Sequence, residues 1–586
     1  MVKRPQCWAC REKRIRCGSE TPTCVKCSVK GIQCPGYSRT RPLRWMRPFN
    51  PESQYHLRGK HNSQYLLQTK KSGGYPSNHV SLSGNSGSSV PVALRPAGLD
   101  LHDLVIAEEI MYYNERIAPD LVPTDNPANP FRWDISESLQ APLYLRHAFA
   151  AISIFHRIVQ RRWDLSRLVV RPGSSTRSVT PTVTSALSTR ESGELARAGS
   201  DQLDAEERRF YSYYASAIRS VNDALSRTSR SLDYSILGGV MMLLYSQLQQ
   251  GAYGQWRTHL EGVKALIDSF GGSKILVLND EEECMLVSNI LLVDIMATTT
   301  CPVASMPPDT AERHQSYHRI LSLLNRKGIQ SSFYIPANLI KIIVEVNLIR
   351  AKSISTKVFG DAVECPVDYK ISEVLSKLNH YTPLDGSTSH RSNPTYIDSR
   401  PENDPALSHP EGQGCPEIRD RLLLEARSYA HCAQCFRAAI KIYAVETYLA
   451  AELAGGCENC CDAGPILQSS STRDRMIGAR QIAYHELMES LKFLLGAKRR
   501  QEHGVHYWKF VFWPLAIAGV QSVIVHRNGP DFAFIHGQLL EMTADLGTMG
   551  MRDAAFLLEK LWTASTADTT TMTWDEVFKD APLFLL

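Results

Sequence analysis

CWACREKRIRCGSETPTCVKCSVKGIQC, residues 7–34, is the stretch that decides how this chain begins to fold. Its six cysteines have the spacing C-x2-C-x6-C-x6-C-x2-C-x6-C, so the unit C-x2-C-x6-C occurs twice. The cysteines are Cys7, Cys10, Cys17, Cys24, Cys27 and Cys34. Thiolates at this spacing are typical ligands of structural zinc, which takes four in a closed tetrahedral site. Two zinc ions have eight coordination positions, so six sulfurs satisfy both if two of them bridge.

A disulfide framework is the alternative use of these cysteines. It would require an oxidising compartment. The first ten residues, MVKRPQCWAC, contain no apolar stretch, so no signal peptide is expected. The repeated spacing therefore favours zinc over disulfides.

The residues between the second and third cysteines form a basic run. Four cations lie there, Arg11, Lys13, Arg14 and Arg16. Many charge runs are only solvated helix faces, but metal ligands clamp this run at both ends and hold its side chains on a rigid base. We therefore expect the first half of the motif to present a basic helix to DNA. The second half, with Val25, Lys26 and Val29, is expected to pack against the first.

The same residues carry a family resemblance. The segments are Cys10-Arg11-x-Lys13-Arg14-x-Arg16-Cys17, Pro22 before Cys24, and Cys34-Pro35-Gly36-Tyr37. They resemble the fungal zinc binuclear cluster (Zn(2)-C6 type) transcription factors. The resemblance implies that Cys7 and Cys24 bridge the two zinc ions and that the first helix enters the major groove over a CGG-type triplet. Lys13 and Arg14 match the base-reading positions, where cations suit guanine. The other expected DNA contacts are Arg11, Arg16, Lys26, Arg39 and Arg41.

Charge is distributed unevenly along the chain. The 586 residues carry a formal charge of +5, yet residues 1–71 hold 16 Lys and Arg against 3 Asp and Glu. The remainder holds 49 against 57, which makes it acidic. A basic head on an acidic body is the electrostatic pattern of a DNA-binding module joined to a regulatory domain. Lys3 and Arg4 could also serve nuclear import, although short basic runs are weak signals.

Composition divides the chain into three parts. We predict a zinc cluster domain at 1–40, a basic and then Gly/Ser/Pro-rich linker at 41–100, and an all-helical domain at 101–586. No heptad pattern survives two turns within 38–71, so a dimerising coiled coil is not supported there and a homodimer stays open. The helical pattern is clearest at 256–267 and 424–454. Polar loops are expected near 171–204, 383–418 and 455–475.

The body shows a second resemblance in patches. These are residues 112–133, WRTHLEGVKALIDSFGG at 256–272, WPLAIAG at 513–519, and the late tryptophans Trp562 and Trp574. They look like the fungal-specific transcription factor domain. That resemblance implies a helical regulatory domain that couples DNA binding to transcription, and no enzyme.

Several features of the body suggest chemistry but have simpler explanations. Cys432 and Cys435 share a helical stripe with apolar residues, so packed thiols are favoured over a second zinc site. Cys457, Cys460 and Cys461 lie in a predicted loop, where their reactivity stays open. His259 has no nucleophile or carboxylate motif beside it, so we expect a hydrogen-bonded structural histidine.

Two apolar segments near the C-terminus also have alternatives. FVFWPLAIAGVQSVIV, residues 510–525, is shorter than the roughly 20 residues that a membrane span needs, so a buried helix is expected. WDEVFKDAPLFLL, residues 574–586, mixes acidic and bulky apolar residues. That composition is typical of activation segments, but it also suits a terminal helix packed on the core, which is the favoured interpretation.

Three functions are compatible with these patterns. The favoured one is a nuclear, zinc-dependent regulator of RNA polymerase II transcription, of activator type, that binds double-stranded DNA and the transcription machinery and controls a metabolic or secondary-metabolite gene set. The alternatives are a zinc-cluster module that binds protein and a helical enzyme or metabolite receptor. The four cations disfavour the second function, and the absence of nucleotide-binding and nucleophile motifs disfavours the third. A small-molecule effector stays open.

Overall fold

Helices form the regular structure of the chain, and no strand occurs among the residues that the structure describes. In the head, the computed structural model describes residues 7, 10, 17–18, 20 and 24–29. Beyond the head it describes 101–579, apart from residue 128 and the segments 170–183, 228–233, 253–255, 270–280, 327–333, 359–366, 384–415, 454–466, 501–505 and 565–571.

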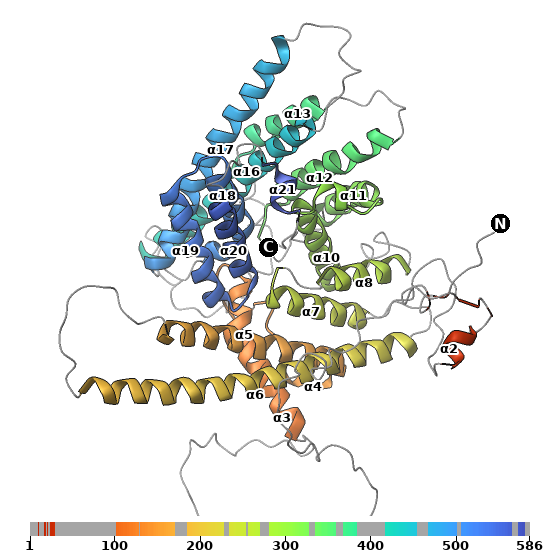
Figure 1. Ribbon diagram of the computed structural model, residues 1–586, viewed down its shortest axis with the longest axis vertical. Coiled ribbons are helices and arrows are strands. Elements are labelled where there is room, and N and C mark those ends of the chain that lie inside the picture. The colour runs from red at the N-terminus through yellow and green to blue at the C-terminus, as the bar shows by residue number, and fades with distance from the viewer. Residues whose placement is uncertain are drawn as a thin grey trace, which may run out of the picture. The chain divides into compact units, whose positions relative to one another are not determined.

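The chain divides into two compact units, Met1–Val105 and Ile106–Leu586. The first contains the short helix α2 (Val25–Val29). The second begins within helix α3 (Leu101–Tyr112), and its described residues are mostly helical (Figure 1). After α3, the elements up to residue 305 are η2 (Tyr113–Ile117), η3 (Ala118–Leu121), α4 (Ile135–Gln140), α5 (Leu143–Val169), α6 (Thr184–Arg227), α7 (Tyr234–Gln250), α8 (Trp256–Ser269), α10 (Glu281–Thr299) and η4 (Val303–Ser305). The later elements are α11 (Thr310–Arg326), α12 (Ala337–Val358), α13 (Val367–His380), α16 (Pro416–Leu453), α17 (Leu467–Arg500), η7 (Tyr507–Phe510), α18 (Phe512–Ile524), α19 (Gly529–Leu546), α20 (Gly550–Ala564) and α21 (Trp574–Val577).

Helix α18 lies at the centre of the body, because every residue from Phe512 to Val523 is buried. Its proline, Pro514, sits in the first turn, where a missing N–H breaks no helical hydrogen bond. Trp513 stacks on Phe436 of α16 and donates its indole N–H to the Thr299 hydroxyl, 3.0 Å away, at the end of α10. The predicted buried helix over 510–525 is therefore confirmed. None of the described helices combines the length and apolarity that a bilayer crossing requires.

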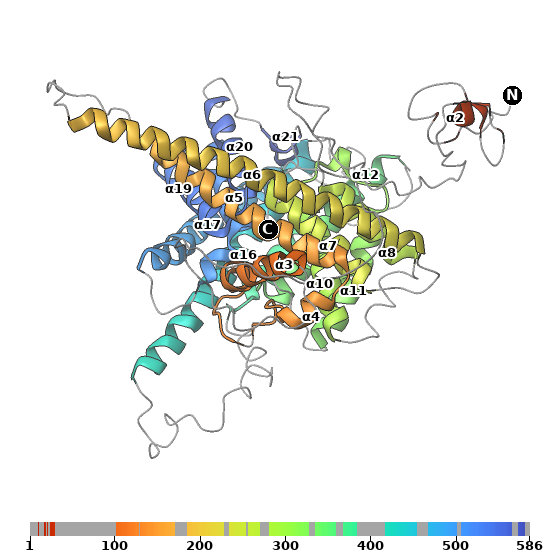
Figure 2. The same ribbon diagram turned by 90° about the horizontal axis from the view of Figure 1, so that it is seen from below.

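Two long helix pairs frame the body. Helices α5 and α6 run side by side in both views, and α16 packs along α17 (Figures 1 and 2). Two salt bridges join helix α3 to the first pair. Glu109 of α3 is 3% exposed, and its carboxylate contacts Arg157 of α5 at 2.6 Å and Arg209 of α6 at 2.9 Å. Two arginines around one buried carboxylate hold the three helices in a fixed register.

The helical stripes predicted from sequence are confirmed, but two loop boundaries were wrong. Helix α8 buries Trp256, Leu260, Val263 and Ile267, and α16 includes residues 424–453. The loop predicted at 171–204 is helical from Thr184 onward, because its alanines and leucines are strong helix formers and α6 continues along α5.

The other two predicted loops are tested only at their ends. Residues 384–415 lie outside the described part, and α16 begins at Pro416, a residue suited to a first helical turn. Helix α17 begins at Leu467, so the last nine positions of the loop predicted at 455–475 are helical instead. Because the first residues of α6 and α17 are largely polar, they were predicted to lie in loops.

Three buried histidines should make the body acid-sensitive. Burial lowers the pKa of His156, His259 and His314 to about 4, below the ordinary value of about 6.5. The unfolded chain therefore binds more protons between these values, so stability is full above about pH 6.5 and falls as the pH drops towards 4. We expect each histidine to cost up to about 2 kcal/mol of unfolding free energy between pH 7.5 and 5.

Urea unfolding followed by far-UV circular dichroism at pH 7.5, 6.5 and 5.5 measures this effect. The His259→Gln variant should show a shallower loss with acid than the unmodified chain. An unfolding midpoint that stays constant or rises on acidification would contradict the expectation.

Candidate metal centre

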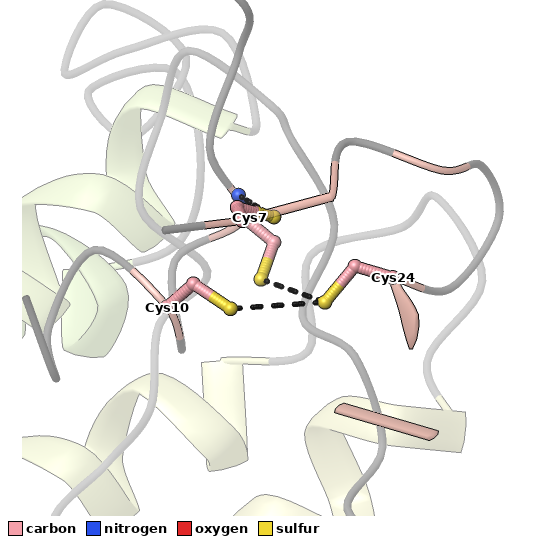
Figure 3. A group of neighbouring side chains, drawn as sticks. Cys7, Cys10 and Cys24 are labelled. Carbon is pink, nitrogen blue, oxygen red and sulfur yellow. Dashed lines mark hydrogen bonds between the residues drawn. The ribbon is translucent and has the colours of Figure 1, made fainter. Parts of the chain in front are cut away.

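Five of the six motif cysteines fall among the described residues, and they cluster together. Cys7, Cys10, Cys24 and Cys27 are at most 1% exposed, and Cys17 packs against them. Cys24 immediately precedes α2, and Cys27 is the one buried residue of that helix. Figure 3 shows the Cys7, Cys10 and Cys24 sulfurs pointing toward one another. Cys34 lies outside the described residues.

The sulfur separations among the described cysteines fit tetrahedral metal binding and are too long for disulfides. The Sγ atoms of Cys7 and Cys24 are 3.6 Å apart, those of Cys10 and Cys24 3.7 Å, and those of Cys7 and Cys27 3.8 Å. A disulfide would require about 2.05 Å. Four sulfurs at about 2.3 Å from one zinc ion lie about 3.8 Å from each other. The cysteines thus already lie at the edge length of a zinc–thiolate tetrahedron.

The described cysteines of the head form one complete set of four ligands, and Cys27 lies beside it. The sulfurs of Cys7, Cys10, Cys17 and Cys24 all lie within 4.8 Å of one another, which makes one complete set of four. Cys27 lies outside that set and contacts Cys7 through sulfur, while its backbone N–H donates to the Cys24 sulfur at 3.4 Å. Cys7 and Cys24 are therefore the two members of the set whose sulfurs also contact Cys27.

The surroundings of the sulfurs disfavour thiolates unless a cation is present. Burial raises the pKa of Cys10, and the neighbouring cysteines raise it further. Burial also raises the pKa of Cys7. Two backbone N–H groups favour the thiolate form. The N–H of Cys7 donates to the Cys17 sulfur and the N–H of Cys27 to the Cys24 sulfur, each at 3.4 Å. Zinc supplies the remaining positive charge that thiolates need to lie so close together.

Glu20 is a contributor that sequence reasoning missed. Its carboxylate accepts the backbone N–H of Val25, 3.1 Å away, at the start of α2. The same carboxylate folds back over Gly18, where a Cβ atom would meet it at 2.2 Å. Glu20 thus ties the loop between the two cysteine units to α2. An acidic residue just ahead of a helix start was the signal that could have found it.

We expect Glu20→Ala to weaken DNA binding without removing zinc. Loss of the acceptor leaves the Val25 N–H without this partner and loosens the loop, at a cost of about 1 kcal/mol, or roughly fivefold in affinity. Glu20→Gln keeps an acceptor oxygen and should restore most of the binding. Fluorescence anisotropy and zinc analysis of the full chain measure both effects. Equal affinity of Glu20→Ala and the unmodified chain would contradict this role.

The expected DNA contacts are only partly described. Lys26 is exposed on α2. Arg11, Lys13, Arg14, Arg16, Arg39 and Arg41 lie outside the described residues. The second cysteine unit packs against the first through Cys24 and Cys27, whereas Val25 and Val29 are 54% and 80% exposed. A five-residue helix has one inward face, and the metal ligand Cys27 occupies it.

Cys432, Cys435 and His259 have the structural roles predicted. Cys432 and Cys435 are buried in α16, and burial raises the pKa of Cys432 to about 12. His259 is buried, and its Nε2 lies 3.1 Å from the Tyr214 hydroxyl. Cys457, Cys460 and Cys461 lie outside the described residues. Among the described side chains, only the head cysteines form a group suited to a metal ion.

A cysteine cluster with tetrahedral spacing, set in a basic head and joined to a large helical body, defines a zinc-cluster regulator. Residues 6–44 match the fungal Zn(2)-Cys(6) binuclear cluster domain, and residues 108–586 match the fungal specific transcription factor domain. The chain therefore belongs to the fungal transcription factor family with these two domains. It is a transcription regulator, a non-enzymatic class of protein, and its cluster domain binds two zinc ions.

Two named relatives match different shares of the chain. The chain is 20% identical to the phomenoic acid biosynthesis cluster-specific transcriptional regulator of Leptosphaeria maculans over 570 residues, 96% of this chain and 86% of the relative. It is 41% identical to the acriflavine sensitivity control protein acr-2 of Neurospora crassa over 51 residues, 9% of this chain and 8% of the relative. No solved structure gives a significant match.

Proposed function

We propose that the chain is a sequence-specific DNA-binding regulator of RNA polymerase II transcription that acts in the nucleus. The observation that carries the proposal is the cysteine cluster, whose sulfurs have the spacing of a zinc site, combined with four cations between two of its ligands. All six motif cysteines, Cys34 included, hold the two ions, and Cys7 and Cys24 bridge them. When bound, zinc supplies a structural cross-link to a head too small to fold on an apolar core.

The head reads DNA through the first cysteine unit. Its basic helix enters the major groove of a CGG-type half-site, where Lys13 and Arg14 donate to guanine edges. Arg11, Arg16, Lys26, Arg39 and Arg41 contact phosphates and set the register. The exposed position of Lys26 on α2 and the excess of cations in residues 1–71 support this division.

The test is base preference. We expect Lys13→Ala to reduce binding to a CGG-containing duplex by about 1–3 kcal/mol and to relax preference at one base pair. Lys26→Ala, the matched control, should weaken all duplexes alike and make binding less salt-dependent. Anisotropy titrations of the full chain against single-base variants measure both. If Lys13→Ala weakens every duplex equally, Lys13 contacts phosphate only, and absence of DNA binding would favour a protein-binding cluster.

The helical body is the part of the chain that regulates the genes to which the head binds. We infer an architecture with the head at 1–40, a tether at 41–100 and the regulatory body at 101–586. The Leptosphaeria relative is named for one biosynthetic gene cluster, and its match covers most of both chains. This supports control of a secondary-metabolite gene set through the transcription machinery. Genome-wide occupancy of the tagged chain tests the gene set; binding spread over unrelated genes would contradict it.

A further inference from the structure

The C-terminal helix α21 is short, but its two apolar side chains and that of the next residue are deeply buried. Trp574 is 3% exposed, Val577 5% and Phe578 1%. The Trp574 indole N–H donates to the Thr299 carbonyl at 2.8 Å, and its ring lies 5.8 Å from that of Tyr443. These contacts seat α21 against the end of α10 and the middle of α16 (Figure 1).

A buried arginine receives the acidic residue of this helix. Arg350 of α12 is 3% exposed and donates to the Asp575 carboxylate at 2.6 Å. The other carboxylate oxygen accepts the Val303 backbone N–H at 2.9 Å. Four further Arg350 bonds go to neutral oxygens, namely the carbonyls of Thr298, Thr299 and Cys301 and the Tyr443 hydroxyl. A buried cation held by neutral groups, beside an N–H, is a carboxylate receptor.

Part of the receptor is held by contacts outside α21. Tyr443 donates to the Asn347 side chain at 2.7 Å, so the hydroxyl that orients Arg350 is itself held by α12. The described part of the tail, in contrast, holds one short helix. Its helix has four residues and one capping box, between Thr573 and Glu576. So short a helix is unstable alone, so the receptor contacts are what keep it folded.

The buried residues are also the ones that an acidic activation segment uses. Residues 574–586 mix acidic and bulky apolar side chains, the composition of such segments. A tail that inserts Trp574, Asp575 and Phe578 into the body cannot present them to another protein. We propose that the Arg350 site is an intramolecular receptor for the acidic–aromatic tail, and that docking withholds the tail from the transcription machinery. The withholding step rests on the proposed function; the receptor does not.

Peptide binding tests the receptor directly. A fluorescent peptide of residues 572–586 should bind saturably to the chain that lacks those residues. It should bind the full chain at least about tenfold more weakly, because the attached tail competes at high effective concentration. Asp575→Asn in the peptide, or Arg350→Gln in the shortened chain, should each weaken the affinity of the peptide about tenfold. Equal binding in all combinations would overturn the receptor.

Hydrogen exchange tests the full chain in case the shortened one does not fold. Asp575→Asn should speed amide exchange at 573–578 while α12 and α16 stay protected. Glu576→Gln is the matched control, since it removes a charge from an exposed residue of the same helix and keeps the capping geometry. Unchanged exchange in Asp575→Asn, or joint opening of α12 and α16, would show that α21 is a fixed part of the core and overturn the proposal.

A reporter at a promoter that the tagged chain occupies tests withholding. Asp575→Asn should raise output several-fold at unchanged occupancy, and Glu576→Gln should not. Unchanged or lower output would refute withholding. If the unmodified chain occupies no promoter, the proposed function fails instead, and the peptide and exchange results alone decide the receptor.

Discussion

Cys24→Ala should remove both zinc ions and abolish specific DNA binding. In the proposed site Cys24 bridges the two ions, and it makes sulfur contacts to Cys7 and Cys10 and accepts a hydrogen bond from the Cys27 backbone. Its loss therefore takes a ligand from each ion at once. Structural zinc contributes on the order of 10 kcal/mol to small metal-bound folds. The head has nothing to replace it, because the buried cluster described there consists of cysteines.

Native mass spectrometry of the full chain should find two zinc equivalents in the unmodified protein and fewer than one in Cys24→Ala. Cys17→Ala, which removes a ligand from one set only, should be intermediate in zinc content. Cys432→Ala is the matched control, since it deletes a buried thiol of α16 and should leave two equivalents. Two equivalents retained in Cys24→Ala would contradict the bridging role.

Gly547→Ala should destabilise the body by about 3 kcal/mol. Gly547 ends α19 with a φ of +59°, a left-handed conformation that costs an L residue about 1 kcal/mol. A Cβ atom there would lie 2.0 Å from the Cδ2 atom of His156. The His156 ring cannot retreat easily, because it is 1% exposed and bonded to the Tyr112 hydroxyl at 2.9 Å. Overpacking of this kind adds about 2 kcal/mol.

Gly537→Ala, on the same helix, should change the stability of the body in the opposite direction. Gly537 lies inside α19, and a Cβ atom there would meet nothing within 4 Å. Alanine should therefore stabilise the body by about 0.5–1 kcal/mol. Urea unfolding of the full chain, followed by circular dichroism, measures both variants. Shifts of the midpoint in the same direction would contradict the close approach of α19 to His156.

The metal centre was largely predictable because its determinants are close together in the sequence. Ligand spacing within residues 7–34 indicated zinc, and the sulfur separations agree. Glu20 was missed because its role depends on where the loop turns back, which spacing does not reveal. The exposure of Val25 and Val29 was missed for a similar reason: one buried ligand decides which face of α2 points inward.

The helices of the body were predictable in type and less so in extent. Apolar residues at helical spacing identified α8, α16 and α18. The starts of α6 at Thr184 and α17 at Leu467 lie in polar stretches, which composition alone classed as loops. A polar segment becomes helical when the helix it extends is packed against a neighbour, and that neighbour is remote in the sequence.

The sequence by itself determined the metal chemistry and the helical class, because zinc coordination and helical periodicity depend on residues a few positions apart. Only the tertiary structure decided that Asp575 reaches Arg350, 225 positions away, and that Gly547 lies against His156. The physical reason is desolvation. A buried charge or ring has to be matched by whatever group the chain path brings beside it. The spacing of residues in the sequence does not predict which distant groups the fold brings together.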